Sequence, residues 1–153
     1  MLSKRLVKLI EDHAEGLTQT VLDDVLHNPR TVALRTAPQD ELTRRAYDVY
    51  HNLGHWLIDK TEDAIERTYE EVGRQRFGHH VPLSEMVYTL IIMKLHLRDF
   101  IRVSGVVDSA VALYQEEELH LLVDQFFDRA IYHAVRGYEQ AAEGRPLAEH
   151  ATV

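Results

Sequence analysis

The chain has 153 residues, enough for one domain with a substantial hydrophobic core. Its formal net charge of −8, from 25 acidic and 17 basic residues, argues against general nucleic-acid binding and against docking on anionic membranes. The lack of cysteine excludes disulfides and thiolate chemistry and fits a reducing cytoplasm. The N-terminal apolar run is interrupted by basic residues, so it predicts an amphipathic helix and neither a signal peptide nor a membrane span.

Helical periodicity extends over most of the chain, and no segment shows strand-like alternation of apolar and polar residues. The seven glycines and four prolines fall mostly between the periodic segments. We therefore predict an all-α bundle. The expected helices, in chain order, cover residues 3–26, 38–59, 61–77, 83–105 and 109–142, the last being regular from about residue 115.

Local signals mark the ends of the first three helices. Gly16 either breaks the first helix or is tolerated inside it, and Asn28-Pro29 stops it before a loop over 30–37. Thr61 is expected to cap the third helix. That helix, over 61–77, has a thin apolar stripe and many charges, which predicts that it covers the core from outside.

The helix expected over 83–105 is apolar on nearly every side along its first turns. One core of this size seldom surrounds a helix so completely, and apolar residues beyond what one core covers commonly mark an interface. We therefore predict a homodimer in which this central helix and the last helix pair, the alternative being that the other helices enclose the central one. The expected interface residues are Tyr88, Ile92, Leu95, Leu121 and Leu122.

The last helix is expected to end at Gly144-Arg145-Pro146, because glycine commonly follows a helix end and proline cannot continue a helix. Terminal residues beyond such a stop are usually frayed. The sequence therefore predicts one domain over 1–143 and a flexible C-terminal tail over 144–153.

Ten histidines call for a test of haem and metal sites. His51 and His55 are four residues apart, a spacing that can chelate a metal, but they share a face with Asp48 opposite the apolar stripe. We interpret them as a solvated pair, and His79 and His80 as polar residues of the turn before the central helix. In the alternative hypothesis of a haem-binding protein, these four histidines are the candidate ligands.

Glu117-Glu-Leu-His120 has the Glu-x-x-His spacing of di-iron bundles, but such sites need this motif on two helices and a single Glu from each of two more. No second Glu-x-x-His is present, so a di-metal bundle stays a second alternative. His120 and His133 lie at opposite edges of the inward face of the last helix, and His13 is interpreted as a hydrogen-bonded core residue.

Phosphate-binding loops and nucleophile motifs are absent, so we predict no enzymatic activity, catalytic residue, cofactor or metal.

Val81-Pro-Leu-Ser-Glu-Met-Val87, the Leu97-Arg-Asp-Phe100 that follows, and a last helix with Asp124 and Asp128 resemble the N-terminal sensor domain of RsbR-type stress regulators. The resemblance covers about residues 3–142 and rests on helix-turn and packing patterns. It implies a dimeric, globin-like fold that binds no haem. In haem globins the proximal histidine lies a couple of turns before this Val-Pro, where this chain has Arg74 or Gln75.

The resemblance further implies a cytoplasmic sensory or regulatory domain of the stress response without enzymatic activity. Such a domain would dimerise and pass a signal along its last helix to a downstream signalling protein or a fused output module, with a small shift between paired helices as the switch. A haem- or gas-binding globin-type sensor is the alternative.

Overall fold

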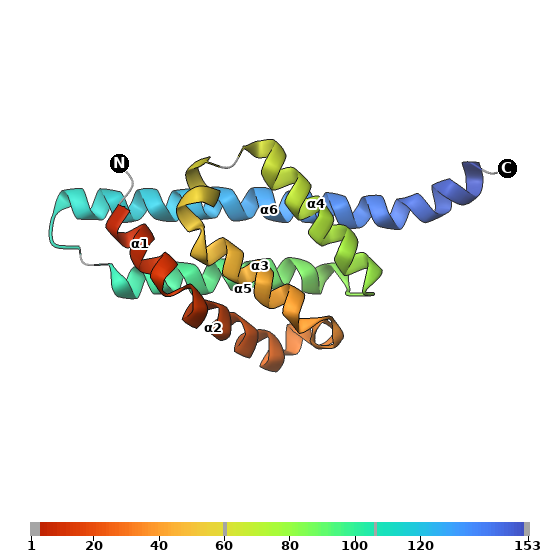
Figure 1. Cartoon of the computed structure of the whole chain (residues 1–153), viewed down its shortest axis with the longest axis horizontal. Coiled ribbons are helices and arrows are strands. Elements are labelled where there is room, and N and C mark those ends of the chain that lie inside the picture. The colour runs from red at the N-terminus through yellow and green to blue at the C-terminus, as the bar shows by residue number, and fades with distance from the viewer. Residues whose placement is uncertain (1–3, 60, 106, 152–153) are drawn as a thin grey trace.

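A computed structural model describes residues 4–59, 61–105 and 107–151, with side chains described as far as Gly144. All regular structure in these residues is helical, which confirms the all-α prediction. Two long antiparallel helices, α5 and α6, run along the molecule, and the shorter helices pack against them (Figure 1). The elements are α1 Lys4–Asp12, α2 Ala14–His27, η1 Pro29–Thr31, η2 Ala33–Thr36, α3 Gln39–His51, η3 His55–Asp59, α4 Glu62–Gly78, α5 Leu83–Ser104 and α6 Ala110–Ala151.

The first predicted helix is interrupted at His13 and not at Gly16, which lies inside α2. The Nδ1 atom of the His13 ring lies 2.8 Å from the carbonyl oxygen of Leu9, where it competes for the acceptor of a regular helical hydrogen bond. The His13 ring is exposed and packs beside Phe100 at a centroid distance of 5.5 Å. His13 is thus hydrogen-bonded as expected, but its predicted place in the core is wrong.

The helix expected over 38–59 is also divided. Its regular part ends at His51, and a π-helical turn, η3, follows over His55–Asp59. Between them, the backbone N–H of Gly54 donates a hydrogen bond to Glu11 Oε2 of α1 at 3.1 Å. The Gly54 N–H is therefore bonded to a side chain of another helix. This bond lies where the regular α-helix gives way to the π-helical turn. The segment expected as a loop over 30–37 forms two short 3₁₀ turns.

Thr61 caps α4 as predicted, because its side-chain oxygen accepts a hydrogen bond from the backbone N–H of Ala64 at 3.2 Å. The Thr61→Ala variant is expected to lose about 1 kcal/mol in its free energy of unfolding. Urea denaturation at neutral pH measures the loss. Thr61→Ser keeps the hydroxyl group and serves as the control, which should stay close to the wild type. Equal losses in both variants would show that the cap hydrogen bond contributes nothing.

The core is assembled mainly around α5 and α6. The hydroxyl of the fully buried Tyr50 on α3 donates a hydrogen bond to the Met93 carbonyl oxygen of α5 at 2.8 Å, which joins the two helices through the core. Burial strongly raises the pKa of Tyr50, so this hydroxyl stays protonated and donating. The buried apolar residues of α5 and α6 are Met86, Leu90, Ile92, Met93, Leu97, Ile101, Leu119, Val123, Phe126, Phe127, Ala130 and Ala134.

Two glycines let α4 and α6 cross with their backbones in close contact. A Cβ atom added at Gly73 would lie 2.6 Å from the backbone nitrogen of Tyr138. A Cβ atom added at Gly137 would lie 2.6 Å from Glu70 Cα. Real Cβ atoms do not approach so closely, so only glycine fits either position. The α4 helix is therefore a closely packed part of the bundle, whereas the sequence predicts only an outer cover.

The backbone of α6 continues past Gly144-Arg145-Pro146 to Ala151, so the predicted end of this helix is wrong. A proline inside a helix removes one backbone donor and its ring crowds the carbonyl four residues earlier, so the helix continues here against the local sequence signal. The C-terminal part of α6 projects beyond the ends of α4 and α5 (Figure 1). No helix in the described ranges combines the length and apolar character that a bilayer crossing requires.

Candidate functional site

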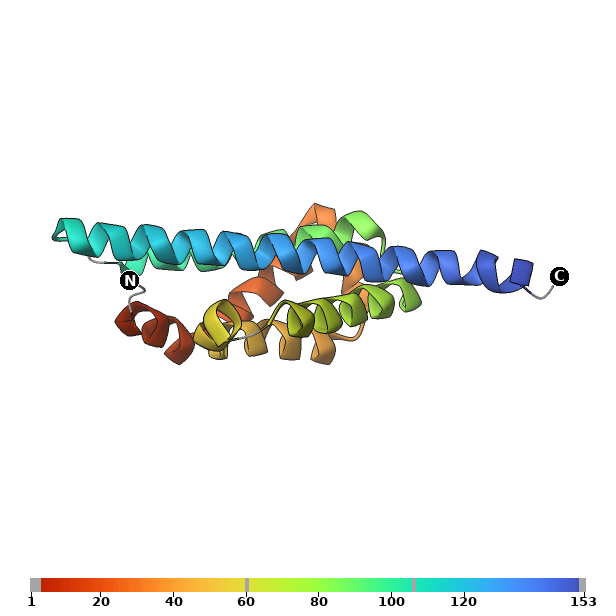
Figure 2. The ribbon, with the colours of Figure 1, turned by 90° about the horizontal axis from the view of Figure 1, so that it is seen from above.

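The outer side of the α5–α6 pair is the surface with the most distinctive chemistry. Figure 2 shows α6 running the length of the molecule, with α1, α3 and α4 on one side of it and α5 behind it. Leu95 of α5 is 52% exposed and Leu121 of α6 is 56% exposed. Tyr88 of α5 and Leu122 of α6 are half-buried and pack against the core. We call the surface formed by Tyr88, Leu95 and Leu121 the α5–α6 face; Leu122 lies on the stripe of α6 that carries Arg129 and His133, which contact Glu62 of α4.

Ile92 does not belong to this face. It is only 2% exposed and lies in the core, so it offers no surface to a partner, and its predicted interface role is wrong. One turn further along α5, His96 Nε2 lies 2.7 Å from Asp24 Oδ2 of α2. This side of α5 is therefore covered by α2, which explains the burial of Ile92.

An ion pair joins the two helices within the α5–α6 face. Arg98 Nη1 of α5 donates to both carboxylate oxygens of Asp124 on α6, at 2.6 and 2.7 Å. Charge-assisted hydrogen bonds of this kind are short and directional, so they fix the register of the two helices. A shallow pocket of about 260 Å³ lies beside this pair, and it is lined by Leu95, Arg98, Asp99, Arg102 and His120.

The imidazole of His120 is the unusual group in this pocket. Its Nδ1 atom is buried and has no hydrogen-bond partner, while its Nε2 atom lies 4.0 Å from Glu116 Oε1. Burial and the positive charge of Arg98 lower the pKa of His120, against the opposing charges of Glu116 and Asp124. The ring is therefore neutral at pH 7, and acidification would place a charge beside Arg98.

Tyr88 is tied to the rest of the chain at the other end of the face. Its hydroxyl accepts a hydrogen bond from Arg30 Nη1 at 3.2 Å, and the guanidinium carbon lies 5.3 Å from the ring centroid. A partner that used Tyr88 would meet this arginine as well. Tyr88 is consequently a rim residue of the face, with Leu95 and Leu121 at its exposed apolar positions.

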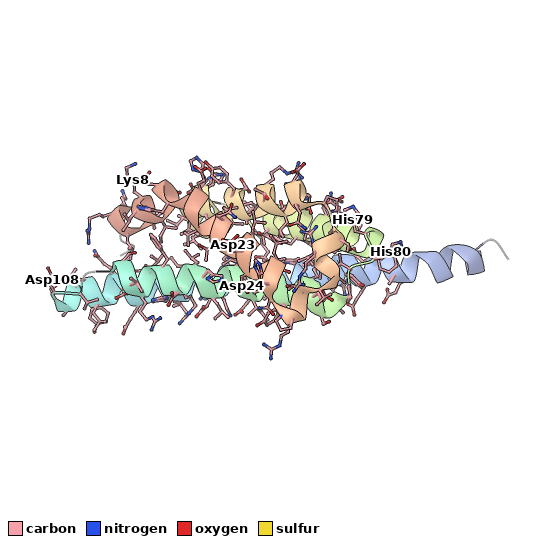
Figure 3. The ribbon with its side chains drawn as sticks, turned by 90° about the horizontal axis from the view of Figure 1, so that it is seen from below. Lys8, Asp23, Asp24, His79, His80 and Asp108 are labelled. Carbon is pink, nitrogen blue, oxygen red and sulfur yellow. The ribbon has the colours of Figure 1, made fainter. Side chains whose placement is uncertain are left out.

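The four candidate haem ligands do not converge. His51 is exposed and stacks on Tyr47, with ring centroids 5.0 Å apart, and His55 is exposed beside Asp59 with its Nδ1 atom 3.2 Å from a carboxylate oxygen. Their solvated positions agree with the interpretation as a surface pair. His79 and His80 are exposed in the turn between α4 and α5, at one end of the bundle (Figure 3). None of these four rings points into the core.

The Glu117-x-x-His120 motif also stays apart from other ligands, since Glu117 is exposed and His120 faces the pocket beside Arg98. Among the described residues, one group has the composition and spacing of a metal site: Glu66 and Glu70 of α4 and His133 of α6. This group was not predicted from the sequence. Its only sequence signal is the four-residue spacing of Glu62, Glu66 and Glu70, and the partner histidine lies on a helix far along the chain.

Comparison of the chain with protein-family models, with curated proteins and with solved structures gives no match.

Proposed function

We propose that this chain is a non-enzymatic, globin-like sensory or regulatory domain of the cytoplasm, related to RsbR-type stress regulators. In this proposal the α5–α6 face binds a second copy of the chain. The projecting C-terminal part of α6 then carries the signal to a downstream signalling protein or a fused output module. The observation that carries the proposal is the exposure of Leu95 and Leu121 on the two neighbouring helices α5 and α6.

The size of the α5–α6 face supports a second copy as its occupant. The α5 helix has 22 residues, which corresponds to about 33 Å of helix length. Two parallel strips of helix, each about 10 Å wide, offer an area comparable with the roughly 800 Å² per partner of a standard interface. In a two-fold dimer the same face of each copy would meet, so Leu95 and Leu121 of one copy would lie against the α5–α6 face of its partner.

Signal transfer would use the rigidity of the helix pair. The bond between Arg98 and Asp124 and the shared core join α5 and α6, so we expect the two helices to move together within one copy. A change at the face therefore shifts α6 as a unit against its partner, and the shift reaches the projecting C-terminal end. The signal itself would act by favouring one of two packings of the paired helices.

The dimer is tested by placing a charge on the face. Leu95→Glu and Leu121→Glu are expected to convert the dimer into a monomer, since each would bury carboxylates at the two-fold interface, where the nearby Arg98 and Arg102 already pair with Asp124 and Asp99. Light scattering coupled to gel filtration measures the mass, and circular dichroism checks that the helices are retained. Leu26→Glu is the matched control, because Leu26 is an exposed leucine of α2. A monomeric wild type, or folded face variants with unchanged mass, would contradict the proposal.

A further inference from the structure

The α4 helix presents three carboxylates toward α6, at intervals of one helical turn: Glu62, Glu66 and Glu70. Opposite them lies the imidazole of His133, which is 8% exposed. One ligand atom from each of Glu66, Glu70 and His133 lies within 4.8 Å of the other two. Small rotamer changes of the two half-buried glutamates would bring these atoms to the separation found around one metal ion.

The histidine is held in place by Glu62. Its Nε2 atom lies 2.8 Å from Glu62 Oε1, and Arg129 Nη1 lies 3.4 Å from the other carboxylate oxygen of Glu62. Histidine ligands of metal sites commonly bond a carboxylate through the second ring nitrogen, which fixes the ring orientation. The Glu62–His133 contact has this form, which would assign metal coordination to Nδ1. The glycine crossing at Gly73 and Gly137 sets the distance between the two helices nearby.

We propose that Glu66, Glu70 and His133 bind a divalent transition-metal cation such as Zn²⁺, with Glu62 orienting the histidine. One imidazole nitrogen and two carboxylate oxygens are a suitable donor set for Zn²⁺, and a water molecule would complete the coordination. Three carboxylates around one imidazole also leave excess negative charge. Arg74 offsets part of it at the rim, 3.8 Å from Glu70, but it is shared with Glu71 at 3.0 Å.

A bound cation would clamp α4 to α6. The site lies on the α4 side of α6, whereas Leu121 faces outward on the α5–α6 face. The inference therefore does not depend on the proposed dimer, and either can fail alone. A cation that binds the folded chain and not the unfolded chain would stabilise the folded state.

The surface pair His51–His55 is the main competitor for added metal, so the decisive experiment starts from the His51→Gln, His55→Gln double variant. Untagged protein is titrated with Zn²⁺ by calorimetry, and thermal unfolding is followed with and without Zn²⁺. The double variant is expected to bind one Zn²⁺ per chain and to unfold at a higher temperature with the metal. Adding Glu66→Gln or Glu70→Gln should weaken binding at least about tenfold.

Asp63→Asn is the matched control, because Asp63 is an exposed residue of the same helix and should leave zinc affinity unchanged. Two results would overturn the site. One is the loss of saturable binding in the His51, His55 double variant, which would assign zinc to the surface pair. The other is equal affinity in the Glu66→Gln, Glu70→Gln and Asp63→Asn variants when all are folded by circular dichroism, since His133 would then serve only as a hydrogen-bond partner of Glu62.

Discussion

Replacing Gly137 by alanine is expected to destabilise the chain by about 3 kcal/mol, a large share of the stability of a domain. The added Cβ would lie 2.6 Å from Glu70 Cα and also against the Glu70 carbonyl, so it would meet rigid backbone and no movable side chain. The two helices would have to separate, and the packing around Tyr69 and Phe126 would loosen with them. Gly73→Ala meets the backbone of α6 in the same way and should cost a similar amount.

Chemical denaturation measures the unfolding free energy of these variants. Comparison with Gly16→Ala separates the effect of the close helix crossing from the general effect of replacing a glycine in a helix. Gly16 lies inside α2 with open space around its Cα, so alanine there should stabilise the chain by about 0.5–1 kcal/mol. The Gly73, Gly137 double variant should lose less than the sum of the single losses, because the helices separate only once. A stabilising Gly137→Ala would show that α4 and α6 do not cross at this point.

The sequence predicts element types well where the signal is local. Periodicity identifies the helices, Thr61 identifies the start of α4, and Pro82 and Gly105 flank α5 as expected. The break at His13 depends on a side-chain contact with the Leu9 carbonyl, and η3 accompanies a hydrogen bond from Gly54 to Glu11 of another helix. Such events are set by tertiary contacts, which a periodic pattern does not contain.

The candidate surface could be predicted only in part for the same reason. A helix with apolar residues on all sides shows that excess apolar surface exists, but it does not show which side the neighbouring helices cover. Leu95 and Leu121 are exposed, whereas Ile92 is covered on the side of α5 that faces α2. In the sequence, the pattern of Glu62, Glu66 and Glu70 indicates a solvated stripe. In the structure, the packing of α4 on α6 places His133 opposite them.

The Arg76→Met variant is expected to lose about 3 kcal/mol at pH 7. Arg76 is 4% exposed, and its guanidinium bonds the carboxylate of Glu41, which also accepts a hydrogen bond from Arg45 Nε at 3.0 Å. Burial alone would raise the pKa of Glu41, but the charges and hydrogen bonds of Arg76 and Arg45 outweigh burial and lower it. Without Arg76, a largely buried carboxylate keeps only one cationic partner.

The pH dependence separates this charge effect from lost packing. In the wild type the lowered pKa of Glu41 stabilises the folded state fully above the pKa of the unfolded chain, and this contribution is lost as pH falls through the folded-state pKa. In Arg76→Met the pKa of Glu41 rises, so the carboxyl is protonated earlier during acidification and no longer opposes folding. The difference in unfolding free energy between variant and wild type should therefore shrink between pH 7 and about pH 4.

Urea denaturation at both pH values measures this change, with Arg74→Met as the matched control. Arg74 is 42% exposed and pairs with Glu70 and Glu71 of its own helix, so its loss should change stability by less than about 0.5 kcal/mol at either pH. Adding Glu41→Gln to Arg76→Met should recover part of the loss at pH 7, because the uncompensated carboxylate is then removed. The loss of unfolding free energy in Arg76→Met could instead be the same at both pH values and unchanged by Glu41→Gln. That result would mean that Arg76 stabilises the fold through the packing of its aliphatic stem against α3 and α5, and not through its charge.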